Sequence, residues 1–236
     1  MKVVVINGNS RHGSTWHCKE LLIKALESFE HVETTDYVLP KDMPHFCKGC
    51  FSCIMRGEGN CPHAQFISPI VAAMEEADLI VLTSSVYALD VTGQLKALLD
   101  HLCFMWLSHR PNPNMFKKMG VTIATTAGAG LGHTTKTMTN SLKFWGVKRI
   151  FSMKNAVAAM KWDDIADHKK KKIQRETKKL AGKIVSVKSK MDRLSPPLFT
   201  RFMFGTMTGM MKKNTWNLHD RHHWETQGWL SGGKPF

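Results

Sequence analysis

Five candidate strands, separated by helical patterns, constrain the fold more than any other feature of this sequence. They cover residues 2–6, 32–38, 78–83, 119–126 and 148–155. The third is an almost continuous apolar run, which is typical of a parallel strand covered on both faces. Strands that alternate with helices pair in parallel. The sequence therefore predicts an α/β fold with a doubly wound, five-stranded parallel sheet in the order 2-1-3-4-5.

Apolar residues at helical spacing predict the helices between these strands. They mark residues 21–29, 67–74, 95–106 and 137–144, and the third helix is expected to begin at Asp90 or Thr92. Residues 46–63 form a long connection that we expect to be irregular. Connections of this length inside an α/β fold are usually functional.

Positive charge is concentrated in the last third of the chain. The formal net charge is +14, and residues 161–236 hold 17 Lys and Arg against 7 Asp and Glu. We therefore expect one domain at residues 1–160 and a basic helical C-terminal extension at residues 161–236. No groove-reading motif accompanies this charge, which argues against a nucleic-acid partner.

The extension contains a helix that opens at Lys169–Lys172. Its apolar stripe is expected to dock on another surface or to form a dimer, and comprises Ile173, Leu180, Ile184, Val187 and Met191. Residues 196–211 are the nearest approach to a membrane segment, but Arg201 interrupts them and we expect them to pack. The sequence has neither a secretory signal pattern nor about 18 consecutive apolar residues. The expectation is a cytoplasmic protein without a membrane partner.

Polar and small residues follow three of the predicted strands. Because the carboxyl ends of parallel strands meet at one edge, these loops are expected to converge at the point where the strand order reverses. The first also precedes a helix, whose N-terminal N–H groups attract anions such as phosphate. The candidate binding residues are Asn9, Ser10, Arg11, Ser14, Thr15 and Trp16, then Ser85, Val86, Tyr87 and Ala88, and finally Thr126, Ala127, Gly128 and Gly130.

Three segments carry a resemblance to a known family. They are Gly8-x-x-Arg11-x-x-Ser14-Thr15, Ser84-Ser85-Val86-Tyr87, and the run from Gly93 to His101. Over residues 2–155 the chain resembles the flavodoxin-like NAD(P)H-dependent FMN reductases. The resemblance implies that the three loops bind FMN and that NAD(P)H is the electron donor. The alternative is that Tyr87 packs and that Gly128 and Gly130 are ordinary turn residues.

Four cysteines form the most specific motif, Cys47-x2-Cys50-x2-Cys53-x7-Cys61-Pro62. Closely spaced thiolates of this kind can surround an iron–sulfur cubane. The spacing resembles the compact motif of iron–sulfur flavoproteins, which implies that all four ligate one [4Fe–4S] cluster. Zinc, a dithiol or disulfide, or a lining of the flavin site remain as alternatives. Cys18 and Cys103 are expected to be buried, inert thiols, and His63 a capping or surface residue.

The segment from Asp220 to Leu230 resembles the tail of some larger members of the flavoprotein family. Trp224 and Trp229 are expected to cover the flavin, to line a subunit interface, or simply to pack.

Two functions follow from the resemblance. The favoured one is an FMN-dependent oxidoreductase that takes hydride from NADH or NADPH and passes electrons to an acceptor. No general acid or base is named, because the cofactor carries the chemistry. The alternative is an electron-transfer iron–sulfur flavoprotein that docks on an acidic redox protein such as a ferredoxin. An apolar helix and the resemblance favour a homo-oligomer, either a dimer or a tetramer.

Overall fold

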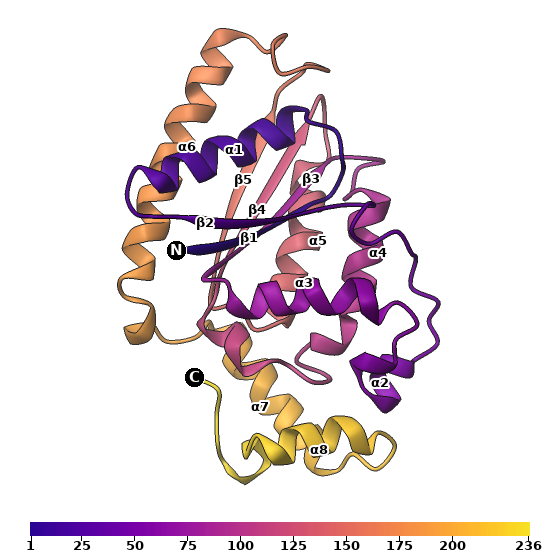
Figure 1. Ribbon diagram of the computed structural model, residues 1–236. Coiled ribbons are helices and arrows are strands. Elements are labelled where there is room, and N and C mark those ends of the chain that lie inside the picture. Colours follow the sequence, from indigo (N-terminus) through magenta and orange to yellow (C-terminus); the bar gives the residue numbers. More distant parts are fainter.

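The computed structural model describes residues 1–236 and contains one five-stranded parallel sheet (Figure 1). Its spatial order is β2-β1-β3-β4-β5, which confirms the predicted flavodoxin-like fold. The strands are β1 (Lys2–Asn7), β2 (Glu33–Val38), β3 (Leu79–Ser85), β4 (Met119–Thr126) and β5 (Arg149–Ala156).

Helices cover both faces of the sheet. On one face, α1 (Ser14–Glu27) and α6 (Asp167–Lys188) pack over Val3, Val5 and Val81. On the other, the helices α3 (Ala64–Glu76), α4 (Gly93–His101) and α5 (Leu131–Phe144) pack over Val4, Ile80 and their neighbours. Successive strand residues point to opposite faces, so one apolar run supplies both layers of the core.

A third apolar cluster lies in the lower part of Figure 1. It is formed by α7 (Leu198–Lys212), α8 (Leu218–Thr226) and a 3₁₀ turn at Trp229–Ser231. Phe204, Trp224 and Trp229 pack there against Phe116 of the main domain, and both tryptophans are buried. Of the three roles expected for these tryptophans, ordinary packing is the one observed.

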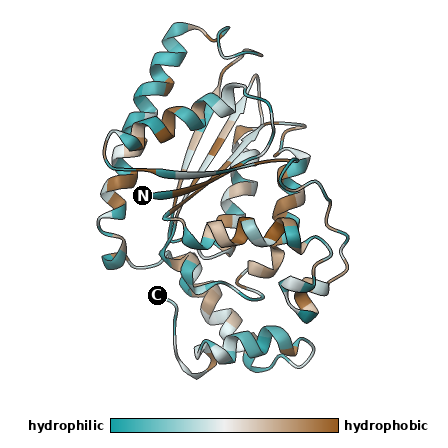
Figure 2. Ribbon diagram, viewed as in Figure 1, coloured by the Kyte–Doolittle hydropathy of each residue, from teal (hydrophilic) through white to brown (hydrophobic).

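Of the two roles expected for the helix after Lys169, docking is the one observed, and the surface that it docks on belongs to the same chain. Figure 2 shows α6 as a mostly hydrophilic helix, but its apolar stripe packs against α1 of the same chain. Ile173 and Ile184 are buried in that contact. The stripe therefore requires no partner, and it gives no support to a homo-oligomer. The division of the chain at residue 160 stays a prediction.

Several element boundaries differ from the expected ones, but the start of α4 does not. Thr92 is its N-cap, as expected, because the Thr92 side chain accepts a hydrogen bond from the backbone N–H of Leu95 and α4 begins at Gly93. This helix ends at His101 and continues as a 3₁₀ turn, Leu102–Met105. The connection at 46–63 is not wholly irregular, because it contains α2 (Ser52–Arg56) and the 3₁₀ turn Glu58–Asn60. Further 3₁₀ turns lie at Pro113–Lys117 and Met191–Arg193.

None of these helices is both long and apolar enough to cross a lipid bilayer.

Candidate functional site

The loops that follow β1, β3 and β4 converge on one hollow of about 190 Å³. Close approach of the first two loops requires Gly8, because a Cβ there would lie 2.5 Å from the Thr83 carbonyl oxygen. The hollow is lined by Asn9, Arg11, Gly13, Ser14, Thr15, Ser85, Val86, Tyr87, Thr125, Thr126, Ala127, Val157, Ala159 and Met160. None of these residues is acidic, which suits an anionic ligand.

Hydrogen bonds between side chains hold the three loops together. Asn9 Nδ2 donates to Ser85 Oγ at 3.1 Å, and Thr15 Oγ1 lies 2.9 Å from the same oxygen. Thr15 Oγ1 also lies 2.5 Å from Thr125 Oγ1. The first turn of α1 is thereby fixed to the ends of β3 and β4, so the floor of the hollow is preorganised.

The N-terminus of α1 opens into this hollow. Its N-cap is Gly13, which provides no side-chain hydrogen bond to the first-turn N–H groups. These groups carry the positive end of the helix dipole and are available to an anion. Arg11 crosses the mouth and donates to the carbonyl oxygen of Met160, beyond β5. The arrangement suits a phosphate group at the end of a larger ligand.

Nine predicted residues line the hollow, namely Asn9, Arg11, Ser14, Thr15, Ser85, Val86, Tyr87, Thr126 and Ala127. Five others lie outside its lining, namely Ser10, Trp16, Ala88, Gly128 and Gly130. Trp16 stacks on His12 with ring centroids 3.9 Å apart. Gly130 has φ of +95° and packs against Val86, so its constraint is structural. Whether any of these residues contacts FMN stays a prediction.

The four motif cysteines line a second, smaller cavity on the opposite side of the sheet from α1. Gly49 (φ +61°) and Phe51 (φ +56°) turn the backbone sharply between Cys47 and Cys53. The cavity is lined by Cys47, Lys48, Cys50, Phe51, Cys53, Cys61, Pro62, His63 and His101. All six cysteines of the chain are free thiols. All four cysteines of the motif therefore line a common space.

Hydrogen bonds and burial shift the pKa values of the thiols of this loop in opposite directions. The hydroxyl of Ser52 lowers the pKa of Cys50. The Cys103 thiol, helped by the Arg110 guanidinium, lowers the pKa of Cys53 to about 6. Burial raises the pKa of Cys61. At neutral pH these shifts favour the thiolate form of Cys53 and the protonated form of Cys61.

Two predictions about neighbouring residues are confirmed only in part. Cys103 is half-buried and not fully buried, but its hydrogen bond with Cys53 raises its pKa, which agrees with an inert thiol. His63 is the N-cap residue of α3, but its side chain makes no capping hydrogen bond; it is buried, and its Nδ1 lies 3.0 Å from His101 Nε2. Donor atoms of Cys61, His63 and His101 all lie within 4.8 Å of one another. By contrast Cys18 is buried as expected, and burial raises its pKa to about 12.

Residues 1–163 match the NADPH-dependent FMN reductase family. The chain belongs to this family. The match includes both the hollow at the carboxyl edge of the sheet and the cysteine loop, so the two sites described above belong to an FMN reductase scaffold.

Two relatives of this FMN reductase family member are named iron–sulfur flavoproteins. The one from Archaeoglobus fulgidus is 30% identical over 149 residues, which cover 62% of this chain and 64% of the relative. The one from Methanocaldococcus jannaschii is 37% identical over 101 residues, which cover 42% of this chain and 51% of the relative. The chain thus spans about half to two thirds of the length of these relatives.

Solved structures of two azoreductases share the fold. An azoreductase from Bacillus anthracis superimposes with a TM-score of 0.62 at 15% identity, covering 78% of this chain and 99% of that one. An FMN-dependent NADH-azoreductase from the same species, solved in complex with FMN, gives a TM-score of 0.58 at 11% identity. It covers 77% of this chain and all of its own. At these identities the likeness establishes the fold alone.

The lining residues that follow β5 were not predicted from the sequence. Val157, Ala159 and Met160 belong to the hollow of this FMN reductase family member, as does Thr125 at the end of β4. The signal was present, because the loop after the fifth parallel strand must reach the same edge of the sheet. Three exit loops were expected to form the site, whereas four line the hollow.

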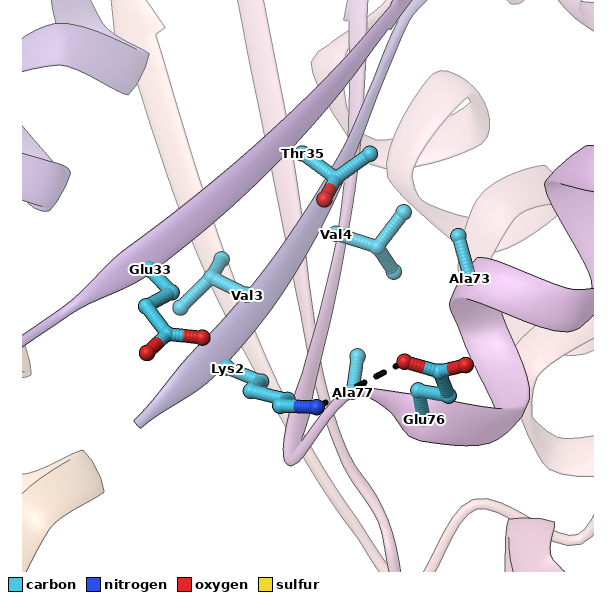
Figure 3. A pocket seen from close by; sticks show the side chains of 8 residues that line it. All are labelled: Lys2, Val3, Val4, Glu33, Thr35, Ala73, Glu76 and Ala77. Carbon is cyan, nitrogen blue, oxygen red and sulfur yellow. Dashed lines mark hydrogen bonds and ion pairs between the residues drawn. The ribbon is translucent and has the colours of Figure 1, made fainter.

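A further hollow lies at the amino ends of β1 and β2 and is drawn in Figure 3. Lys2 Nζ donates to Glu76 Oε2 at 3.5 Å, and Val4, Thr35 and Ala73 are among the other residues that line the hollow. None of the predicted site residues lines it. In an FMN reductase fold this is the edge opposite to the ligand-binding one.

Proposed function

We propose that this protein is a cytoplasmic, FMN-dependent NAD(P)H oxidoreductase that passes electrons through FMN and a [4Fe–4S] cluster to an acceptor. The observation that supports the cluster is that one cavity is lined by Cys47, Cys50, Cys53 and Cys61. Membership of the FMN reductase family supports the binding of flavin. The names of the relatives support the combination of the two.

The hollow at the carboxyl edge fits FMN in its chemistry. The phosphate would be held by the first-turn N–H groups of α1, by Ser14 and Thr15, and by Arg11. Backbone of the β3 and β4 loops, at Ser85–Tyr87 and Thr126–Ala127, would flank the ring system. Bound FMN supplies the acceptor for hydride and the donor of electrons. The protein contributes binding, orientation and a preorganised set of hydroxyl groups.

The cysteine cavity fits an iron–sulfur cluster in its donor set. Four thiolates are the usual ligands of a cubane. The lowered pKa values of Cys50 and Cys53 favour the deprotonated form that metal ions require. A single zinc ion is the competing occupant, because Cys61, His63 and His101 offer one sulfur and two nitrogen atoms within 4.8 Å.

Anaerobic purification with iron, acid-labile sulfide and zinc analysis tests the cluster. We expect close to four iron and four sulfide per chain, with their loss in Cys50→Ser. The matched variant Cys18→Ser changes a buried thiol far from the loop and should keep both. One zinc per chain without sulfide, or no metal at all, would overturn the cluster.

The flavin is tested by absorbance and by anaerobic titration with NADPH and NADH. We expect one FMN per chain, bleached by at least one of the two nucleotides. Thr15→Val removes the hydroxyl that joins α1 to Ser85 and Thr125, and should weaken FMN binding about tenfold, as loss of such hydrogen bonds does. A protein that binds no flavin, or a flavin that neither nucleotide reduces, would contradict the reductase assignment.

The exposed face of α6 favours a second function, electron transfer to an acidic protein. Its solvent-facing cations are Lys171, Lys172, Arg175, Lys178, Lys179 and Lys183, with Glu176 as the one acid among them. Such a face attracts a negatively charged partner such as a ferredoxin. Self-association into a dimer or tetramer, and a division of the chain at residue 160, are part of the same proposal.

A further inference from the structure

Arg110 donates hydrogen bonds to the backbone of the cysteine loop, residues 46–63. It lies in the connection between α4 and β4 and is only 6% exposed. Its guanidinium donates to the carbonyl oxygens of Cys53 and Ile54, the latter at 3.1 Å. It also pairs with Glu58 at 3.1 Å. A single side chain thus joins two carbonyl groups of α2, at Cys53 and Ile54, to Glu58 in the 3₁₀ turn that follows it.

Asp220 of α8 holds Arg110 in place. One of its carboxylate oxygens pairs with Arg110 Nη1, and the other lies 2.7 Å from His109 Nδ1. Asp220 is completely buried, so its charge is neutralised only by these neighbours. In addition, Asn217 Nδ2 donates to the Ile54 carbonyl oxygen at 3.2 Å. The Asn217 Oδ1 atom accepts from the Asp220 N–H at 3.0 Å, which joins the two residues.

We propose that Asp220 and Asn217 are positioning residues for the cysteine site, acting through Arg110 and the Ile54 carbonyl group. This inference rests on the proposed [4Fe–4S] cluster. It gives the segment of α7 and α8 a role in metal binding, although none of its residues is a ligand. Cys53 and Cys61 lie at the two ends of an interval whose only regular structure is one short helix and a 3₁₀ turn. Hydrogen bonds from Arg110 and Asn217 hold the backbone of this interval in place.

Arg110 and Asn217 contact backbone atoms of the loop itself, which indicates that they position the loop. A network that served only to attach α8 would need no contact with the carbonyl groups of Cys53 and Ile54. Three donors from two different elements instead converge on these two carbonyl oxygens. Fixing a backbone fixes the direction of the attached thiol, which is how outer groups control a metal site.

Two variants and one control test the proposal in the full-length protein. Asp220→Asn removes the charge that orients Arg110. Asn217→Ser removes the donor to Ile54 but keeps a capping oxygen for α8. The control is Glu225→Gln, which breaks the exposed Arg221–Glu225 pair on the same helix. The readouts are FMN content, the rate at which a ferrous chelator removes iron, and hydrogen–deuterium exchange of residues 47–61 in metal-free protein.

We expect Asp220→Asn and Asn217→Ser to lose iron about tenfold faster than the wild type, the usual size of such outer-shell effects. Exchange at residues 47–61 should also be faster, while FMN content and exchange in the β-sheet stay unchanged. Glu225→Gln should match the wild type in every readout. Unchanged exchange at residues 47–61 in both variants would overturn the proposal, as would a loss of protection spread over the whole sheet in Asn217→Ser.

The proposed cluster and the proposed positioning role are contradicted by different results. A wild-type protein that binds no iron and sulfide would remove the cluster from the proposed function. The exchange experiment uses metal-free protein, so it would still decide whether Asp220 and Asn217 order the loop. Normal cluster content in the wild type, with equal iron-release rates in all variants, would instead reject the positioning role alone.

Discussion

Gly128 and Gly130 lie in the same loop after β4 but face different constraints. Gly130 has φ of +95°, and a Cβ there would lie 2.6 Å from Val86 Cγ1 and 3.0 Å from Leu89 Cα. At Gly128 a Cβ would meet only open space. We predict that Gly130→Ala lowers the free energy of unfolding by about 2–4 kcal/mol, from backbone strain and overlap together.

The matched variant Gly128→Ala should change the same quantity by less than about 1 kcal/mol. Urea denaturation of both variants checks the pair. Equal destabilisation of the two would mean that the β3 and β4 loops do not pack as closely as described.

Cys18 gives a pH dependence whose sign can be worked out. Burial raises its pKa from 9.0 to about 12, so between these values the unfolded chain loses the thiol proton and the folded chain keeps it. Unfolding then releases a proton, and stability falls as pH rises through this window. The slope from this group alone is at most about 1.4 kcal/mol per pH unit.

Cys18→Ala removes that group and should flatten the stability profile above pH 9, the ordinary pKa of the thiol. The measurement is the free energy of unfolding at several alkaline pH values, in wild type and variant. Parallel profiles would show that the buried thiol is not responsible.

At the residue scale, the sequence predicted the polar lining of the hollow but not the surroundings of the cysteines. Asn9, Thr15 and Ser85 follow strand ends in a parallel sheet, so topology alone brings them together. Cys103 and His63 were predicted only in part because their partners are tertiary. Cys103 meets Cys53 only after α4 packs beside the loop, and no local pattern encodes that contact.

At the element scale, α7 and α8 are attached through an aromatic cluster. Trp224 is fully buried and stacks on Phe204 with ring centroids 4.9 Å apart. Its Nε1 donates to the His109 carbonyl oxygen at 2.6 Å. We predict that Trp224→Ala costs about 3–5 kcal/mol of stability, the usual cost of truncating a buried tryptophan.

Trp216 provides the comparison, because it lies between the same two helices and is 66% exposed. Trp216→Ala should cost less than about 0.5 kcal/mol. Thermal denaturation followed by circular dichroism distinguishes the two variants. A large effect of Trp216→Ala would indicate a contact with a partner that covers this tryptophan.

Strand positions were predictable because a parallel strand buried on both faces needs an apolar run, as in Leu79–Leu82. Helix ends were less predictable because they depend on single caps. α5 begins at Leu131, six residues before the expected start at Thr137. This start was not predicted because residues 131–136 show no apolar periodicity of their own. Docking of the α6 stripe was predictable, but α1 as the surface it docks on was not, because periodicity reveals an apolar face but not the surface that covers it.

At the scale of the whole molecule, the basic face of α6 predicts a dependence on ionic strength. Salt at about 0.15 M screens charges beyond roughly 8 Å. Electron transfer to an acidic ferredoxin should therefore slow about tenfold or more between about 20 mM and 500 mM salt. Reduction of a neutral quinone should change little over the same range. Stopped-flow measurements with both acceptors check this.

The double variant Lys178→Glu/Lys179→Glu should lose most of the salt dependence. The control Lys212→Glu/Lys213→Glu makes the same charge change at the end of α7. If both double variants behave alike, net charge rather than the α6 face governs the encounter.

The anchoring of the cysteine loop by α8 also has a consequence for biosynthesis. Asn217 follows its partner Ile54 by 163 positions, whereas every residue that lines the hollow at the carboxyl edge of the sheet precedes residue 161. On the ribosome the residues of this hollow are therefore complete while the loop that bears the thiols still lacks its anchors on α8. We expect loading to be sequential, with flavin entering the nascent or newly released chain first and iron delivered last.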